Sequence, residues 1–271
     1  MRQLTLAISQ FPSIPGDIRG NLDKMLKKIG DAASKNADYV IFPELSLTGY
    51  NYEMMDPELS KVAFSVDDWP LRELETTARK HHISAFVGFI EKRTVPGVYY
   101  NSVAFINAAD QSISSNAKVH LFTKEKLFFK DGENFELCTT PHGKFGMLIC
   151  MDIGFPEAAR IECLAGAELL ISPSAWIEQD RDLWELHLRS RALDNLVFVA
   201  GCNHSGSEGE LHYIGQSMIV DPRGHVLSRL DDKEDMLIST IDLDEVASAR
   251  RRAFHWSTRK PHMYTDISKQ M

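Results

Sequence analysis

The chain has 271 residues, of which 44% are hydrophobic and 25% charged, so it can bury a large core as one α/β domain. A formal net charge of −8, with no basic stripe to offset it, argues against a nucleic-acid binder. The apolar runs fall short of the ~18 residues that a membrane-spanning helix needs, so no membrane partner is expected.

The first part of the chain alternates between the period of two that is typical of strands and the period near 3.6 that is typical of helices. In chain order we predict a strand over 4–10, a helix over 21–34, a strand over 39–42, a helix that opens at Pro70, and a strand pair over 84–91 and 99–107. A long loop rich in Met, Asp and Pro covers 51–68. It is either a lid over a substrate or a surface excursion packed by its own apolar residues.

The later part of the chain continues the alternation. We predict a strand over 144–149, a helix over 156–165, a strand over 168–172, a helix over 182–195, a strand over 197–202, a turn between two strands at 221–224, and a last helix that begins with a capping box at 242–245. No linker divides the chain, so we expect a single domain over 1–271. The tail over 253–271 carries the apolar side chains of Phe254, Trp256, Met263 and Tyr264, which need a partner surface.

The cysteines and histidines indicate where the protein works and which groups it lacks. The four cysteines form no CxxC pair and lie in or near apolar segments, which favours free thiols and a cytoplasmic location. The chain opens directly on a strand pattern, so no signal peptide is expected. No HExxH and no zinc-like Cys/His spacing occurs, and we expect neither a metal nor a cofactor.

Cys150 directly follows the apolar run over 144–149. Asp152 and Pro156 then mark a turn into the next helix. A thiol at such a bend lies at the mouth of a site, near backbone amides that lower a thiol pKa or bind an oxyanion. Taken alone, the same residues also fit a core cysteine, which behaves as a small hydrophobic side chain.

Two more ionisable residues stand at the ends of apolar segments. Glu44 follows the strand over 39–42, and ligands in α/β sheets gather outside the carboxyl ends of strands. Lys118 leads the alternating segment over 118–122, so Lys118 and His120 share a face if this segment is a strand. Taken singly, Glu44 also fits an exposed turn cap and Lys118 a solvated lysine at a strand start.

Glu44, Lys118 and Cys150, in this order, resemble the catalytic residues of the nitrilase superfamily of carbon–nitrogen hydrolases. The resemblance extends to the segments 42–44, 48–50, 118–121, 125–132, 150–153, 155–157, 172–176, 191–195 and Asn203. It implies a four-layer α-β-β-α sandwich, with helices on the outer faces of two packed sheets, and a homodimer across which the tails pack. Members that act on small amides often carry Arg at the position of Gly154, so the substrate subclass stays open.

The chemistry expected of these residues is amide hydrolysis through a thioester. Cys150 attacks the amide carbon, and Glu44 serves as general base if burial raises its pKa toward neutrality. Lys118 and a backbone N–H such as that of Met151 stabilise the oxyanion. Collapse releases ammonia or an amine, and water activated by Glu44 then releases the acid. The resemblance implies that Glu125 keeps Lys118 protonated and oriented.

The expected partner is a small amide-like substrate, and Asp152, two residues after the cysteine, is more typical of amidases than of nitrilases. N-carbamoyl compounds and nitriles on the same fold remain alternatives, as does a catalytically silent binding protein. A Cys-His hydrolase is more distant, because nothing ties a histidine to the cysteine. Tyr50, Trp176 and Asn203 are expected to line the substrate pocket, although packing alone also explains them. His120 is expected to be structural.

Overall fold

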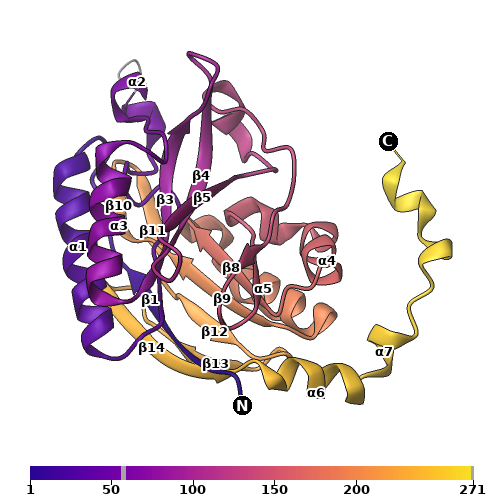
Figure 1. The fold of residues 1–271 in the computed structure, drawn as a ribbon. Helices are drawn as coiled ribbons and strands as arrows, with labels where there is room; N and C mark the ends of the chain where they lie inside the picture. Colours follow the sequence, from indigo (N-terminus) through magenta and orange to yellow (C-terminus); the bar gives the residue numbers. More distant parts are fainter. Residues whose placement is uncertain (56–58, 270–271) are drawn as a thin grey trace.

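The structure, a computed structural model, describes residues 1–55 and 59–269; part of the predicted loop, residues 56–58, and residues 270–271 lie outside it. In the described residues, two six-stranded sheets pack against each other between pairs of helices (Figure 1). Helices α1 (Ile18–Ser34) and α3 (Trp69–His81) cover one outer face, and α4 (Pro156–Leu164) and α5 (Arg181–Asn195) cover the other. The predicted four-layer α-β-β-α sandwich is confirmed.

The first sheet joins the two ends of the chain. Its order is β14 (Asp235–Asp242), β1 (Gln3–Gln10), β2 (Tyr39–Ile41), β3 (Ser84–Lys92), β4 (Tyr99–Asn107) and β5 (Ser112–Ala117). The strands β1, β2 and β3 run parallel, and the pairs of β14 with β1, β3 with β4 and β4 with β5 are antiparallel. The strand β5 is missing from the sequence prediction, because its polar residues give no apolar alternation.

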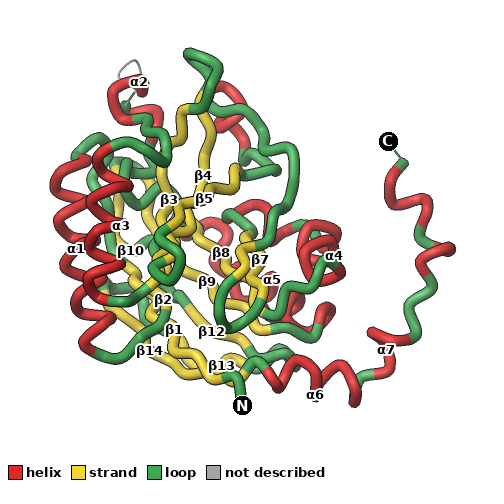
Figure 2. The backbone as a smooth tube through the Cα atoms, in the orientation of Figure 1, coloured by secondary structure: helices red, strands yellow, loops and turns green. Residues whose placement is uncertain are grey.

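The second sheet supplies the opposite inner layer (Figure 2). Its order is β13 (Val226–Arg229), β12 (Met218–Val220), β9 (Phe198–Asn203), β8 (Leu169–Ser174), β7 (Lys144–Met147) and β6 (Cys138–Thr139). The central strands β7, β8 and β9 are parallel, and the predicted turn at 221–224 joins β12 to β13. The sheets touch directly, because Sγ of Cys202 lies 3.3 Å from the carbonyl oxygen of Ile41.

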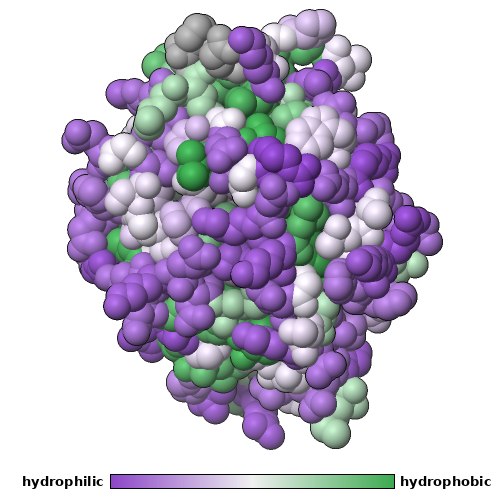
Figure 3. Space-filling model, turned by 90° about the vertical axis from the view of Figure 1, so that its left-hand side faces the viewer, coloured by the Kyte–Doolittle hydropathy of each residue, from purple (hydrophilic) through white to green (hydrophobic). Residues whose placement is uncertain are grey.

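The outer helices follow from amphipathic periodicity. Leu22, Met25 and Ile29 of α1 pack in one cluster with Leu71 and Leu74 of α3 over the outer face of the first sheet. Each such side chain contributes about 1.5–3 kcal/mol of burial free energy. The opposite faces of these helices are largely hydrophilic (Figure 3).

Three smaller features complete the fold. Helix α1 begins earlier than predicted, because Asp17 accepts the Gly20 N–H at 3.0 Å and caps its first turn. A small hairpin of β10 (Ser205–Glu208) and β11 (Leu211–Ile214) stands beside the second sheet. Among the described residues, no helix is long and apolar enough to cross a membrane.

The C-terminal region differs from the prediction. Helix α6 (Asp244–Arg252) starts near the predicted point, but Asp242 accepts the Asp244 N–H at 3.0 Å and the predicted reciprocal capping box with Glu245 is not formed. It is also not the last helix, since α7 (Phe254–Ser257) follows it. The tail then runs away from the sandwich as an extended arm (Figure 1).

Candidate active site

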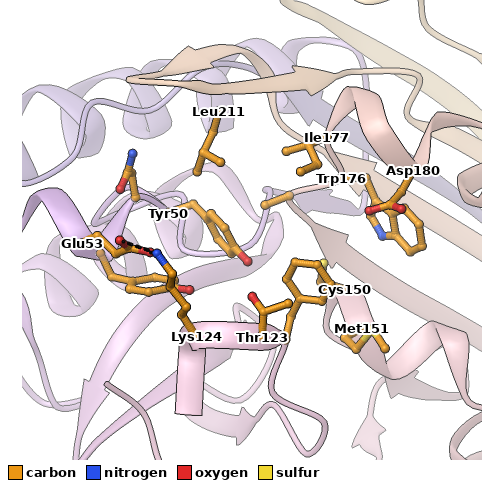
Figure 4. A pocket seen from close by; sticks show the side chains of 14 residues that line it. Tyr50, Glu53, Thr123, Lys124, Cys150, Met151, Trp176, Ile177, Asp180 and Leu211 are labelled. Atoms are coloured by element: carbon orange, nitrogen blue, oxygen red, sulfur yellow. Dashed lines mark hydrogen bonds and ion pairs between the residues drawn. The ribbon is translucent and has the colours of Figure 1, made fainter. Parts of the chain in front are cut away.

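Several loops meet beside a cavity of about 250 Å³ at one end of the two sheets (Figure 4). Cys150 lies at its wall, while Glu44, Lys118 and Glu125 are fully buried. In the described chain the lining residues are Tyr50, Asn51, Tyr52, Glu53, Phe122, Thr123, Lys124, Cys150, Met151, Ala175, Trp176, Ile177, Asp180 and Leu211. This size suits a small molecule.

The buried cluster is centred on Lys118. Its Nζ lies 2.8 Å from Oε1 of Glu44 and 2.9 Å from Oε1 of Glu125. Glu125 is further fixed by the Tyr50 hydroxyl at 3.0 Å and by the Phe122 N–H at 2.7 Å. Burial by itself lowers the pKa of an amine, but the two carboxylates outweigh it and hold the pKa of Lys118 well above its usual value. The lysine is therefore a fixed cation.

Glu44 leaves one oxygen free. Its Oε1 accepts hydrogen bonds from Lys118 and from Nδ2 of Asn101, the latter at 2.7 Å. Its Oε2 is buried and has no hydrogen-bond partner among the described residues. Burial raises the pKa of Glu44 more than these donors lower it. A carboxylate with a raised pKa and an open oxygen has the properties of a general base.

The loop that carries Glu44 passes very close to β3. The Leu47 N–H donates to the Gly88 carbonyl at 2.9 Å, and a Cβ at Gly88 would collide with the backbone of Pro43 and Leu45. Glycine is required here because the two backbones approach without room for a side chain. The Glu44 carbonyl in turn accepts Nε2–H of His204.

Cys150 occupies a strained turn between β7 and α4. Its φ of +48° lies in the left-handed region, and a 3₁₀ helix, Cys150–Gly154, begins there. Asp152 fixes this turn, because its carboxylate accepts the Ile149 N–H at 3.1 Å and the His120 N–H at 2.8 Å. Burial raises the pKa of the Cys150 thiol, the charge of Glu44 adds to this, and Lys118 opposes it.

A backbone amide does act to lower the thiol pKa, as expected, but it does not set the net direction in the resting site. Desolvation outweighs the backbone hydrogen bond from Ala175, which acts in the lowering direction. A protonated thiol needs a base at the moment of attack. Cys150 is close enough to Glu44 for the charge of that residue to act on it.

The segment over 118–122 is not a strand, so that prediction is corrected. Lys118 follows the end of β5 instead of starting a strand, and Gly132 N–H donates to its carbonyl at 2.8 Å. The His120 side chain is not part of the buried cluster around Lys118. Its ring stacks on Phe155 with the ring centroids 3.7 Å apart, and its Nδ1 lies 2.8 Å from Oδ1 of Asp152. This contact set is the structural role expected for His120.

The predicted pocket residues divide into two groups. Tyr50, Met151 and Trp176 line the cavity, whereas Asn203 is fully buried and does not. The Asn203 Oδ1 accepts the Trp176 N–H at 2.7 Å, and its Nδ2 donates to the Gly215 carbonyl at 3.0 Å. The prediction that Asn203 lines the pocket is therefore corrected: it holds the Trp176 backbone from behind.

The loop predicted over 51–68 is packed by its own apolar residues, as one alternative has it, and its start lies at the cavity. Its start, with Asn51, Tyr52 and Glu53, forms part of the cavity wall. Farther on, Met55 and Phe64 are buried, and the short helix α2 (Leu59–Val62) packs against the body. Residues 56–58 lie outside the described part.

Three residues near the site escaped the sequence prediction. Asn101 bridges to Glu44, His204 contacts the Glu44 carbonyl, and Glu208 accepts the backbone N–H groups of Tyr50 and Asn51 at 2.8 and 2.7 Å. A polar residue inside an otherwise buried strand is the signal that points to Asn101. In the described residues, no histidine hydrogen-bonds to the cysteine, and no group of His, Cys, Asp and Glu is placed to hold a metal ion.

Comparison with known proteins agrees with this architecture. A sequence model of the carbon-nitrogen hydrolase family matches residues 5–251, and the chain belongs to that family. A 2-oxoglutaramate amidase of Bacillus subtilis is 33% identical over 248 residues, which are 91% of this chain and 93% of that protein. A probable nitrilase of Schizosaccharomyces pombe is 32% identical over 253 residues, 92% of each chain.

Solved structures give the same result. A carbon-nitrogen hydrolase from Helicobacter pylori superposes with a TM-score of 0.90 at 26% identity and covers 99% of both chains. Nit3 of Saccharomyces cerevisiae, a member of the nitrilase superfamily, superposes with a TM-score of 0.84 at 27% identity, over 93% of this chain and 94% of that one. The chain is thus a hydrolase of carbon–nitrogen bonds by family.

Proposed function

We propose that the protein hydrolyses a non-peptide carbon–nitrogen bond of a small amide through a thioester on Cys150. One observation carries the proposal. A fully buried cluster of Glu44, Lys118 and Glu125 lies behind a cysteine that reaches a cavity of about 250 Å³. Burying three charges is costly, and a purely structural role would be served as well by apolar side chains.

The first half of the reaction forms the thioester. As Sγ of Cys150 attacks the carbonyl carbon, its proton moves to the free Oε2 of Glu44. The negative charge that develops on the carbonyl oxygen is stabilised by the Lys118 ammonium and a backbone N–H such as that of Met151. Glu44 then gives the proton to the leaving nitrogen, the carbon–nitrogen bond breaks, and ammonia or an amine departs.

The second half releases the acid. Glu44 removes a proton from water, and the resulting hydroxide attacks the thioester carbon. The carbon–sulfur bond breaks, and the proton held by Glu44 returns to the thiolate of Cys150. Glu125 keeps Lys118 protonated and in place throughout, because its carboxylate is held by Tyr50 and the loop backbone.

Relatives of the chain leave the substrate open. They include a citrullinase of Francisella tularensis, 29% identical over 291 residues, and a nitrilase of Pyrococcus abyssi, 32% identical over 233 residues. N-carbamoyl compounds and nitriles are therefore the alternatives to test beside simple amides. A catalytically silent binding protein would need none of the three buried charges.

Ammonia release from a substrate panel tests the proposal. The panel contains short aliphatic amides, ω-amides of dicarboxylic acids, N-carbamoyl amino acids and nitriles. We expect an amide to show the highest kcat/KM. Fastest turnover of a nitrile or carbamoyl compound would move the activity to that class, and a complete lack of ammonia would refute the proposal.

We also propose that the protein is a homodimer in the cytoplasm. Phe254, Met263 and Ile267 of the tail are 80%, 66% and 64% exposed, and such apolar surface needs a cover. All four cysteines are free, as a reducing compartment would keep them. Sedimentation at micromolar concentration tests the dimer, and a monomer with the tail folded on its own subunit would reject it.

A further inference from the structure

The cavity wall contains more acidic than basic side chains. Among the described lining residues, Glu53 and Asp180 are acidic and Lys124 is the basic one. Nζ of Lys124 pairs with the Glu53 carboxylate at 3.1 Å, so its charge is compensated within the wall. The Asp180 side chain, by contrast, makes no ion pair or hydrogen bond in the described part of the chain. The wall therefore keeps one net negative charge, on Asp180.

The charges also differ in place. Figure 4 shows Glu53 and Lys124 together on one side of the cavity and Asp180 beside Trp176 on the other. A carboxylate next to an aromatic ring is a favourable setting for an ammonium group, because the ring face and the carboxylate both attract a cation. Asp180 is only partly buried, and it remains accessible from the cavity.

A substrate carboxylate would meet a less favourable setting. A substrate carboxylate at Lys124 would have to share that ammonium group with Glu53, which brings two carboxylates close together. No guanidinium lines the cavity among the described residues.

Resting on the proposed amide hydrolysis, we propose that the site selects amides whose far end is uncharged or carries an ammonium group, with Asp180 as the specificity-determining residue. The selection acts on the end of the acyl chain away from the scissile bond. It works against ω-amides of dicarboxylic acids, whose far end is a carboxylate.

Three substrates of matched length test this proposal: pentanamide, 5-aminopentanamide and 4-carbamoylbutanoate. Each has a chain of five carbons, and the fifth carbon is a methyl group in pentanamide, bears the ammonium group in 5-aminopentanamide and is the carboxylate carbon in 4-carbamoylbutanoate. We expect kcat/KM, measured by ammonia release at low ionic strength and neutral pH, to be highest for 5-aminopentanamide and at least about tenfold lower for 4-carbamoylbutanoate. Added salt should reduce the differences in kcat/KM between the three substrates, because the wall charges are partly exposed and salt screens them.

Variants test whether Asp180 causes the preference for an ammonium group. Asp180→Asn should lower the ratio of kcat/KM for 5-aminopentanamide over pentanamide by about three- to tenfold. Asp182→Asn removes the same charge two residues along, on an exposed position outside the cavity, and should leave that ratio unchanged. Glu53→Gln frees Lys124 and should raise kcat/KM for 4-carbamoylbutanoate.

The outcomes separate the two proposals. Amide turnover in which 4-carbamoylbutanoate is fastest, or an Asp180→Asn variant with an unchanged cation-to-neutral ratio, would overturn the inference and leave amide hydrolysis standing. A lack of ammonia from these three substrates and from every other amide of the panel would overturn the proposed function together with the inference.

Discussion

Nζ of Lys118 lies 2.8 Å from Oε1 of Glu44, and neither side chain is exposed to solvent. Glu125 holds the same ammonium from another direction at 2.9 Å. The carboxylates and the lysine are therefore not equivalent in what their loss would do. Removing either one leaves the lysine paired, whereas removing the lysine leaves two buried acids without a cation.

Glu44→Gln should abolish most of the activity with little effect on folding. It removes the proposed base but leaves Lys118 paired with Glu125. We expect kcat/KM to fall by at least about 100- to 1000-fold, the usual cost of losing one such group, with a thermal midpoint near that of the wild type. His187→Ala, a residue beside Trp176 with no contact to the cysteine, is the control and should stay active. An active Glu44→Gln beside a folded but dead histidine variant would favour a Cys-His pair instead.

Lys118→Ala should lose activity to a similar extent and also lose stability. The variant leaves Glu44 and Glu125 buried together, and breaking a buried ion pair costs about 3–5 kcal/mol. Without the cation Glu44 takes up a proton more readily in the folded state, so the loss of stability relative to the wild type should shrink as the pH falls. Urea unfolding at pH 5 and pH 8 measures this, and a variant as stable as the wild type at pH 8 would contradict the description of the cluster.

Asn101→Ala should move the acid limb of the pH profile. Nδ2 of Asn101 donates to Oε1 of Glu44 at 2.7 Å, and this hydrogen bond lowers the pKa of the carboxyl. Without it the pKa of Glu44 rises, so a higher pH is needed to ionise the base. The acid limb of kcat/KM should shift upward, while Asn107→Ala, at the far end of the same strand, should leave the limb in place. An unchanged limb in Asn101→Ala would show that this hydrogen bond does not tune the base.

Glu208 should make stability fall with rising pH. Burial raises the pKa of Glu208 to about 7, above its unfolded value, so the folded state holds the proton more tightly. The stabilisation is complete below the unfolded pKa and is lost as the pH rises through about 7, by about 2–4 kcal/mol in total. The free energy of unfolding of Glu208→Gln should therefore increase relative to that of the wild type as the pH rises from 5 to 8.5. Glu210→Gln, exposed on the same hairpin, is the matched control. Curves of unfolding free energy against pH that run parallel for Glu208→Gln and the wild type would refute the expectation.

The parts of the fold with apolar periodicity could be predicted from the sequence. The strands before Glu44 and Cys150 and the helices that cover the sheets lie within a few residues of their predicted bounds. The strand β5 could not be predicted, because only its pairing with β4 gives its polar residues a place in a sheet. For that reason Lys118 was placed at the start of a strand when it follows the end of one.

The candidate site divides in the same way. Glu44, Lys118 and Cys150 each stand next to an apolar segment, so their positions were visible in the sequence. Asn101 and Glu208 act on residues 57 and 158 positions away, and only the tertiary structure brings those partners together. The raised thiol pKa also depends on burial, which no local pattern in the sequence reveals.

Turnover by Cys150→Ala tests the central claim most directly. The measurement is ammonia release from the best amide of the panel, with Cys138→Ala, Cys163→Ala and Cys202→Ala as controls. All four thiols are free and buried, and among them only Cys150 lines the cavity. We expect no release above the uncatalysed rate from a folded Cys150→Ala and most of the activity from the other three. Ammonia release by Cys150→Ala at the wild-type rate would contradict the thioester mechanism.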